Sequence, residues 1–119
     1  SLGKGYTMVW GGDLKQTFYA QYGGEASVYG RNISDYRTKG IVPGSGTITV
    51  LTWSSQNADA SSVISVVVNG MEHHVGLTGS AGLVNISPPI AVIAGDVLEI
   101  KGTSIGTKAL STSVTLYIQ

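Results

Sequence analysis

The stretch Ser62–Leu77, SVISVVVNGMEHHVGL, decides the fold. A run rich in valine and isoleucine is followed by Asn69-Gly70 and then by a second run that mixes apolar and polar residues. Asn-Gly readily adopts the positive φ angles that a two-residue type I′ turn requires. The stretch therefore predicts a β-hairpin, and we expect the strands that follow it to complete a sheet around it.

Short β-prone segments separated by turn residues lie on both sides of this hairpin. Thr47–Trp53 is apolar on both faces, which predicts a buried central strand. Pro88-Pro89 removes two backbone donors and so marks a sheet edge, a bulge or a break. The other strand candidates are Tyr6–Trp10, which Gly11-Gly12-Asp13 ends, and then Leu83–Ile93, Val97–Lys101 and Thr112–Gln119.

The class predicted by these segments is all-β, because no segment combines helical periodicity with caps. At 119 residues the chain fits one domain, residues 1–119. Leu14–Ile41 has the weakest pattern, and we expect one or two short strands and irregular loops there. The expected architecture is an antiparallel β-sandwich of the jelly-roll type.

The order of the turns predicts two different ends of this sandwich. With antiparallel strands, the turns at Pro43–Gly46, Asn69-Gly70 and Ala94–Asp96 lie at one end. This requires an even number of strands between Gly12 and Pro43. The longer loops then lie at the opposite end, where variable loops present binding residues; they are Gly11–Lys15, Ser54–Ser61, Gly76–Gly82 and Gly102–Leu110.

The composition limits the classes of partner. Seven basic residues balance seven acidic ones, and charged residues make up only 12% of the chain, against roughly 25% in typical soluble domains. Nucleic acid and anionic membranes are disfavoured as partners, because both require clustered Lys and Arg. No cysteine is present, so there is no disulfide framework. Because the sequence begins at Ser1, we expect it to be the C-terminal part of a longer protein.

Residues typical of catalytic or metal sites are sparse, and we expect neither an enzyme nor a bound metal or cofactor. His73-His74 lies on a strand, where adjacent side chains point to opposite faces and cannot share one metal. The seven acids are dispersed, although Asp13 and Asp59 meet if the predicted loop end is right. Gly79-Ser80-Ala81-Gly82 lacks the spacing of a nucleophile elbow.

Aromatic residues are the stronger candidates for a binding site, because Tyr and Trp rings stack on sugars and anchor interfaces. Trp53 lies in the two-faced apolar strand and is expected in the core or at a subunit interface. Trp10 precedes the Gly11–Lys15 loop. For Trp10 and for the tyrosines of the irregular segment, surface recognition and packing both remain open.

Five motifs, in this order, are MVWGG (8–12), YRTKGIVPGSGTITVLTW (36–53), VISVVVNG (63–70), AVIAGDVLEIK (91–101) and LSTSVTLYIQ (110–119). Together they resemble the jelly-roll tip domains of bacteriophage tail fibres and related bacterial fibre proteins, including fibre tips that predatory bacteria use for prey contact. Similar domains resemble the C1q/tumour-necrosis-factor jelly roll and assemble as trimers. The resemblance implies a homotrimeric adhesin, extracellular at the tip of a virion or bacterial fibre.

The expected ligand is a saccharide or other envelope receptor on a target cell, bound by aromatic stacking and Asp/Asn hydrogen bonds. Two alternatives are a structural cap that registers the fibre shaft without a ligand and, less favoured, a polysaccharide-degrading enzyme. The expected site lies at the long-loop end or between subunits. Its residues are Trp10, Asp13, Tyr19, Tyr22, Tyr29, Asn57, Asp59 and Ser80.

Overall fold

The computed structural model describes residues 5–56, 61–105 and 110–119. Within these ranges the chain forms nine strands and no helix. The predicted all-β class is therefore confirmed. The strands are β1 (Tyr6–Leu14), β2 (Gln21–Tyr22), β3 (Gly40–Ile41), β4 (Gly46–Ser55), β5 (Ser61–Val68), β6 (Met71–Thr78), β7 (Ala81–Val92), β8 (Val97–Ser104) and β9 (Leu110–Ile118).

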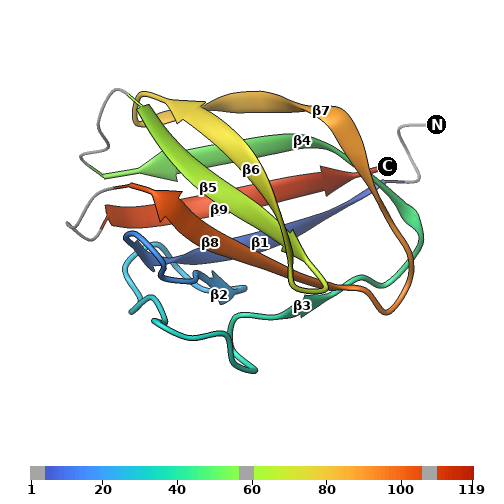
Figure 1. The fold of residues 1–119 in the computed structure, drawn as a ribbon, viewed down its shortest axis with the longest axis horizontal. Coiled ribbons are helices and arrows are strands. Elements are labelled where there is room, and N and C mark those ends of the chain that lie inside the picture. Colours follow the sequence, from blue (N-terminus) through green and yellow to red (C-terminus); the bar gives the residue numbers. More distant parts are fainter. Residues whose placement is uncertain (1–4, 57–60, 106–109) are drawn as a thin grey trace.

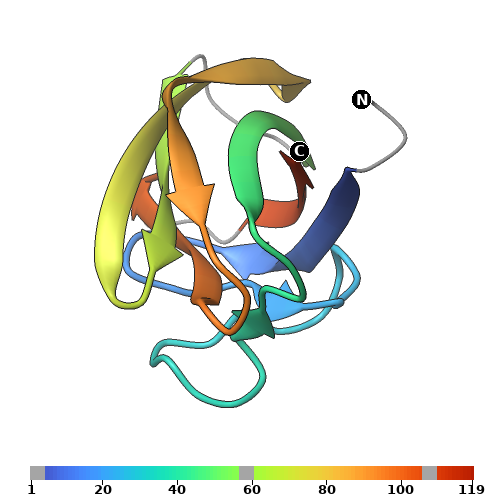
Figure 2. The ribbon, with the colours of Figure 1, turned by 90° about the vertical axis from the view of Figure 1, so that its right-hand side faces the viewer.

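The strands form two sheets that pack face to face (Figures 1 and 2). Sheet A has the order β2-β1-β9-β4-β7, and sheet B has the order β3-β8-β5-β6. All paired strands are antiparallel. With the two-residue β2 set aside, four strands face four in a jelly-roll order, as predicted.

The hairpin formed by β5 and β6 agrees with the prediction from Ser62–Leu77. Asn69 and Gly70 have φ angles of 50° and 87°, the left-handed conformation that a type I′ turn needs. Val68 pairs with Met71 across the turn, and the ladder continues without a shift to Ser61 and Thr78. β8 pairs with the other edge of β5, so β5 lies inside sheet B.

The core lies between the two sheets and follows the alternation of each strand. In β9, for example, Val114, Leu116 and Ile118 are buried, while Tyr117 points outward. Each large apolar side chain that is fully buried contributes about 1.5–3 kcal/mol. Trp53 was expected either in the core or at a subunit interface, and the structure places it in this core.

β4 and β7 confirm two further expectations. β4 lies between β9 and β7, so it is a central strand, as the two-faced apolar pattern predicts. Pro88-Pro89 lies in β7, an edge strand, where the pairing with β4 shifts between Ile48 and Val50. A proline that cannot donate to a ladder is tolerated at such an edge and bulge.

Two predicted loops are shorter than expected. β1 continues through Gly11-Gly12-Asp13 to Leu14, because β9 pairs with it along its whole length. β6 and β7 are separated only by Gly79 and Ser80, and Gly79 has a φ angle of 78°. The predicted flexible loop Gly76–Gly82 is therefore mostly strand. Gly76 lies in β6 and Gly82 in β7, and the Gly79-Ser80 turn between them carries the chain from sheet B to sheet A.

The predicted division into two ends is otherwise confirmed. At one end the Asn69 N–H donates to the Val97 carbonyl over 2.8 Å, which joins the β5–β6 and β7–β8 turns. At the opposite end the Ser55 N–H donates to the Ser80 carbonyl over 2.7 Å. Two strands, β2 and β3, lie between Gly12 and Pro43, but they run in the same direction, because β2 is antiparallel to β1 and β3 is antiparallel to β8. The chain therefore reverses once in this stretch, and that reversal, not an even number of alternating strands, places Pro43–Gly46 at the opposite end from Gly11–Lys15.

The chain between β1 and β3 closes one side of the sandwich (Figure 1, bottom). Ala20 donates to the Ile100 carbonyl of β8 over 3.0 Å, while β2 pairs with β1 of the other sheet. The β2–β3 segment, Gly23–Lys39, then runs along this side. This segment has the weakest sequence pattern, and the structure gives it no regular strand of its own.

Candidate ligand-binding surface

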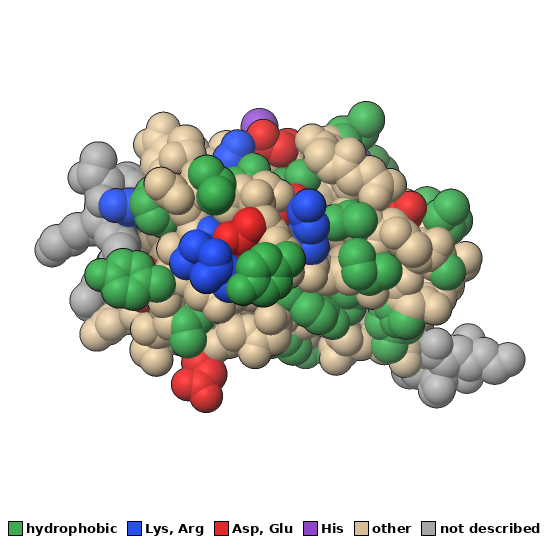
Figure 3. Space-filling view, turned by 90° about the horizontal axis from the view of Figure 1, so that it is seen from below, with side chains coloured by type: hydrophobic (Ala, Val, Ile, Leu, Met, Phe, Trp, Pro, Cys, Tyr) green, Lys and Arg blue, Asp and Glu red, His purple; other side chains and the backbone are tan. Residues whose placement is uncertain are grey.

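The most exposed aromatic side chains of the described chain lie on the β2–β3 segment. Tyr29 and Tyr36 are 82% and 81% exposed. Arg31 and the exposed Ile33 lie between them in sequence, and Arg37 directly follows Tyr36. Figure 3 views the molecule from this side and shows basic side chains gathered among hydrophobic ones. We call the group the tyrosine–arginine surface: Tyr29, Arg31, Ile33, Asp35, Tyr36, Arg37 and Ile41.

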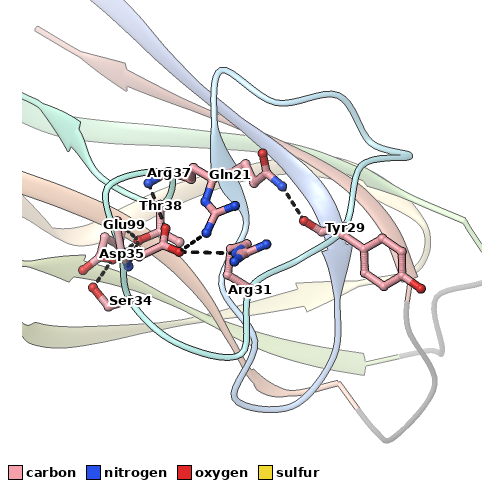
Figure 4. Close-up of polar contacts among 8 residues, drawn as sticks. All are labelled: Gln21, Tyr29, Arg31, Ser34, Asp35, Arg37, Thr38 and Glu99. Atoms are coloured by element: carbon pink, nitrogen blue, oxygen red, sulfur yellow. Dashed lines mark hydrogen bonds and ion pairs between the residues drawn. The ribbon is translucent and has the colours of Figure 1, made fainter.

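Asp35 holds both arginines of this surface (Figure 4). Its Oδ2 atom lies 2.8 Å from Arg37 Nη2 and 3.4 Å from Arg31 Nε. The hydrogen bond from Arg37 lowers the pKa of the Asp35 carboxyl below its usual value. The same bond raises the pKa of the Arg37 guanidinium. At neutral pH the cluster thus contains two guanidinium cations and one carboxylate.

The backbone around the surface is fixed by hydrogen bonds to Tyr19 and to Gln21 of β2, and by close packing on β1. Tyr19 and Arg31 exchange two backbone hydrogen bonds, of 2.6 and 2.8 Å. The Gln21 side-chain amide donates to the Tyr29 carbonyl over 2.6 Å. Gly30 lies against β1 so closely that an added Cβ would stand 1.9 Å from the Asp13 carbonyl oxygen. Tyr29 and Arg31 therefore project from a tightly packed stretch.

A buried carboxylate anchors the other half of the segment. Glu99 of β8 is only 5% exposed, and its Oε2 atom accepts a 2.6 Å hydrogen bond from the Ser34 hydroxyl and another from the Thr38 hydroxyl. Thr38 also accepts the 3.1 Å hydrogen bond of the Asp35 N–H. These bonds tie the residues on both sides of Tyr36 to sheet B.

Tyr36 and Arg37 together can stack a planar or ring-shaped ligand and donate hydrogen bonds to it. The Arg37 guanidinium lies over the Tyr36 ring, 5.0 Å from its centroid, so it covers one face of that ring. The Tyr29 ring extends away from the arginines (Figure 4). Tyrosine rings with free hydroxyls are typical of saccharide sites and of protein interfaces.

Of the predicted site residues, Trp10 lies in the core and not on the surface. Its side chain is 0% exposed, and its Nε1–H donates to the Thr38 carbonyl over 3.0 Å. The expectation that Trp10 contacts a ligand is wrong, because β1 continues past it and buries the ring beneath the β2–β3 segment. Trp10 instead supports the candidate surface from within.

The three predicted tyrosines lie on the same side of the sandwich. Tyr29 belongs to the candidate surface. Tyr22 is half-exposed and packs edge-on against the Trp10 ring, with centroids 5.0 Å apart. Tyr19 is partly buried, with the Lys101 ammonium 5.7 Å from its ring centroid. The structure therefore groups them near the surface, but only Tyr29 is fully presented.

Asp13 and Ser80 lie at the end of the sandwich where they were predicted, but they do not form one site. Asp13 accepts a 3.0 Å hydrogen bond from Ser111, in the neighbouring strand β9. Ser80 follows β6 and lies beyond β4, so the two are three strand spacings apart, about 14 Å. Asn57 and Asp59 lie outside the described residues.

His73 and His74 line a cleft of about 210 Å³ with residues of β7. His73 is partly buried and His74 is exposed, as expected for neighbours on one strand. Glu72 lies 3.8 Å from His74 Nε2. Among the described residues no three His, Cys, Asp or Glu side chains are grouped to hold a metal ion.

Sequence reasoning missed Arg31, Asp35 and Arg37 as site residues. A signal was present: Arg31 and Arg37 are the only arginines of a chain that is poor in charge, and they lie in the most tyrosine-rich stretch. Tyr36, between them, was only counted among the scattered aromatics. What the sequence does not show is that Glu99, which is 61 residues from Thr38 and 65 from Ser34, fixes their loop.

Comparisons with known proteins give no match: no family model, no curated protein and no solved structure is significantly similar to this chain. In the part of the chain that the structure describes, no helix has the length and apolarity to cross a membrane.

Proposed function

We propose that the chain is a homotrimeric fibre-tip adhesin that binds a saccharide or related receptor on the surface of a target cell. The observation that carries this proposal is the tyrosine–arginine surface, with two aromatic side chains more than 80% exposed. Exposed apolar side chains grouped on one surface mark sites that contact a ligand or partner. The jelly-roll fold supplies a rigid scaffold for them.

Binding of a saccharide needs flat apolar rings and nearby hydrogen-bonding groups. Tyr29 and Tyr36 present such rings, the Arg37 guanidinium lies over the Tyr36 ring, and Arg31 adds N–H donors on the same segment. Stacking on an exposed ring is individually weak. Three copies on one fibre tip raise the overall avidity by linking the binding events. This is binding without catalysis, and its setting is the outside of a virion or cell.

The outer face of sheet A supports the trimeric part of the proposal. Among the described strands of this sheet, Asp13 is the only charged residue, and it lies near one end of β1. Val9, Thr115 and Thr52 pair in register across β1, β9 and β4 on the outward side. A face of this kind packs against a second copy without burying a charge.

Glycan-array binding tests the adhesin proposal. The full chain is applied with the variants Tyr29→Ala and Tyr36→Ala, and Met71→Ala serves as the control. Met71 is an exposed apolar residue of β6, away from the tyrosine–arginine surface. We expect reproducible binding by the wild type and Met71→Ala and its loss in either tyrosine variant. Binding by none of the four, or equal binding by all four, contradicts the proposal.

A structural cap that aligns the chains of a fibre shaft is the second candidate. The uncharged outer face of sheet A favours it, because that face alone accounts for trimerisation. The cap predicts a stable trimer that retains no saccharide. The two functions therefore differ only in the glycan-array result, which the tyrosine variants make specific.

A further inference from the structure

The positive charge of the tyrosine–arginine surface exceeds what its own acid neutralises. Both arginines of the chain pair with the single carboxylate of Asp35. The other acid of the β2–β3 segment, Glu25, makes no ion pair with either arginine among the described residues. One carboxylate balances one guanidinium, so the side chains on the outside of the cluster keep a net charge of about +1, while the Glu99 carboxylate lies buried beneath them.

Arg31 has the guanidinium with fewer partners in the protein. It makes no side-chain hydrogen bond to any described residue, and its only ion pair is the long 3.4 Å contact from Nε to Asp35. Its side chain is 28% exposed, against 39% for Arg37, and it extends from a fixed backbone. In contrast, Arg37 already donates a 2.8 Å hydrogen bond to Asp35 and lies over the Tyr36 ring.

A guanidinium presents its donors as a planar fork that matches the two oxygens of a carboxylate. We propose that the saccharide bound at this surface is acidic, with a sugar carboxylate on the Arg31 guanidinium and the sugar ring against Tyr36. This inference rests on the proposed function and names the class of its ligand. The Asp/Asn hydrogen bonds expected from the sequence need free acceptor oxygens, whereas the Asp35 carboxylate is already paired with both arginines.

The test uses matched pairs of saccharides on one array. Oligosaccharides of uronic and nonulosonic acids are printed beside their carboxyl-reduced, neutral counterparts, together with a glycerol-phosphate oligomer. The full chain is compared with Arg31→Gln, Arg31→Lys and the control Lys39→Gln. Lys39 is an exposed cation of the same segment with no ion pair among the described residues, so its substitution changes the net charge equally.

We expect reduction of the carboxyl to weaken wild-type binding about tenfold or more, as charge-assisted hydrogen bonds are lost. Arg31→Gln removes this difference, Arg31→Lys restores part of it, and Lys39→Gln keeps it. High salt weakens binding of the acidic member only. Thermal unfolding verifies that each variant is folded.

Three results overturn the inference. If acidic and carboxyl-reduced saccharides bind equally well, the acid preference is wrong, while the proposed saccharide-binding function still holds. Tighter binding of the glycerol-phosphate oligomer assigns the site to phosphate instead. An unchanged acid preference in Arg31→Gln removes Arg31 from the site. Absence of binding to every saccharide is different, because it contradicts the proposed function itself.

Discussion

Thr38 of the β2–β3 segment donates a hydrogen bond to Glu99 of β8, and both side chains are buried. Ser34 donates to the same carboxylate oxygen over 2.6 Å. The residues that carry Tyr36 and the two arginines are thus held on sheet B by an acid that lies far away in sequence. The position of the candidate surface therefore depends on the hydrogen bonds that Ser34 and Thr38 donate to Glu99 beneath it.

Thr38→Val replaces the hydroxyl with a methyl group of similar size. It leaves the buried Glu99 carboxylate with one donor fewer and the Asp35 N–H without its acceptor. We expect the free energy of unfolding to fall by about 1–3 kcal/mol, measured by urea denaturation. Thr78→Val is the control, since Thr78 is exposed and no side-chain hydrogen bond of it is described. Equal effects of both substitutions would show that the Glu99 contact contributes little.

Gly30→Ala tests the close packing of the segment on β1. The new Cβ meets the Asp13 carbonyl oxygen at 1.9 Å, so the backbone must move. Overpacking of this kind costs about 1–3 kcal/mol or more, and we expect weaker saccharide binding as Tyr29 and Arg31 shift. Gly44→Ala is the matched control, because its Cβ meets nothing within 4 Å. If Gly30→Ala unfolds at the same urea concentration as the control, the packing is looser than the structure shows.

Asp96 makes stability depend on pH at the end opposite the predicted binding loops. The Ile93 N–H and the Asn69 side chain donate to its carboxylate and lower its pKa. A lowered pKa in the folded state contributes stability that is present above the usual value of about 4 and is lost as pH falls through the folded value. The wild type should therefore melt at a higher temperature than Asp96→Asn at pH 7, and the gap should close in acid. A gap that is independent of pH from 7 to 2 would contradict this assignment.

Most of the sandwich was predictable because its strands are local patterns. Asn69-Gly70 predicted the turn of the β5–β6 hairpin. The run Thr47–Trp53, which is apolar on both faces, predicted that β4 is a central strand. The length of β1 was not predictable from Gly11-Gly12-Asp13. Glycines that normally end a strand remain in it here, since β9 supplies a partner for each of them.

The candidate site was harder to predict because tertiary contacts make it. Tyr29 was expected at a site, but Trp10 was expected there as well and is buried under Thr38. No local pattern places Glu99 beneath Ser34. Residue type alone identifies a ring that can stack, whereas its exposure depends on which distant strand covers it.

Thr115→Lys tests the trimer through the outer face of sheet A. Thr115 lies on β9, between Val9 of β1 and Thr52 of β4, at the middle of that uncharged face. In light scattering at micromolar concentration we expect the wild type to have three times the 12.3 kDa chain mass. Three lysines buried at one interface repel one another and lose hydration, so the variant should scatter as a folded monomer. Thr78→Lys, which adds the same charge to β6 of the other sheet, should remain trimeric. A wild type that scatters as a single chain removes the trimer from the proposal, and a trimeric Thr115→Lys moves the interface to another face.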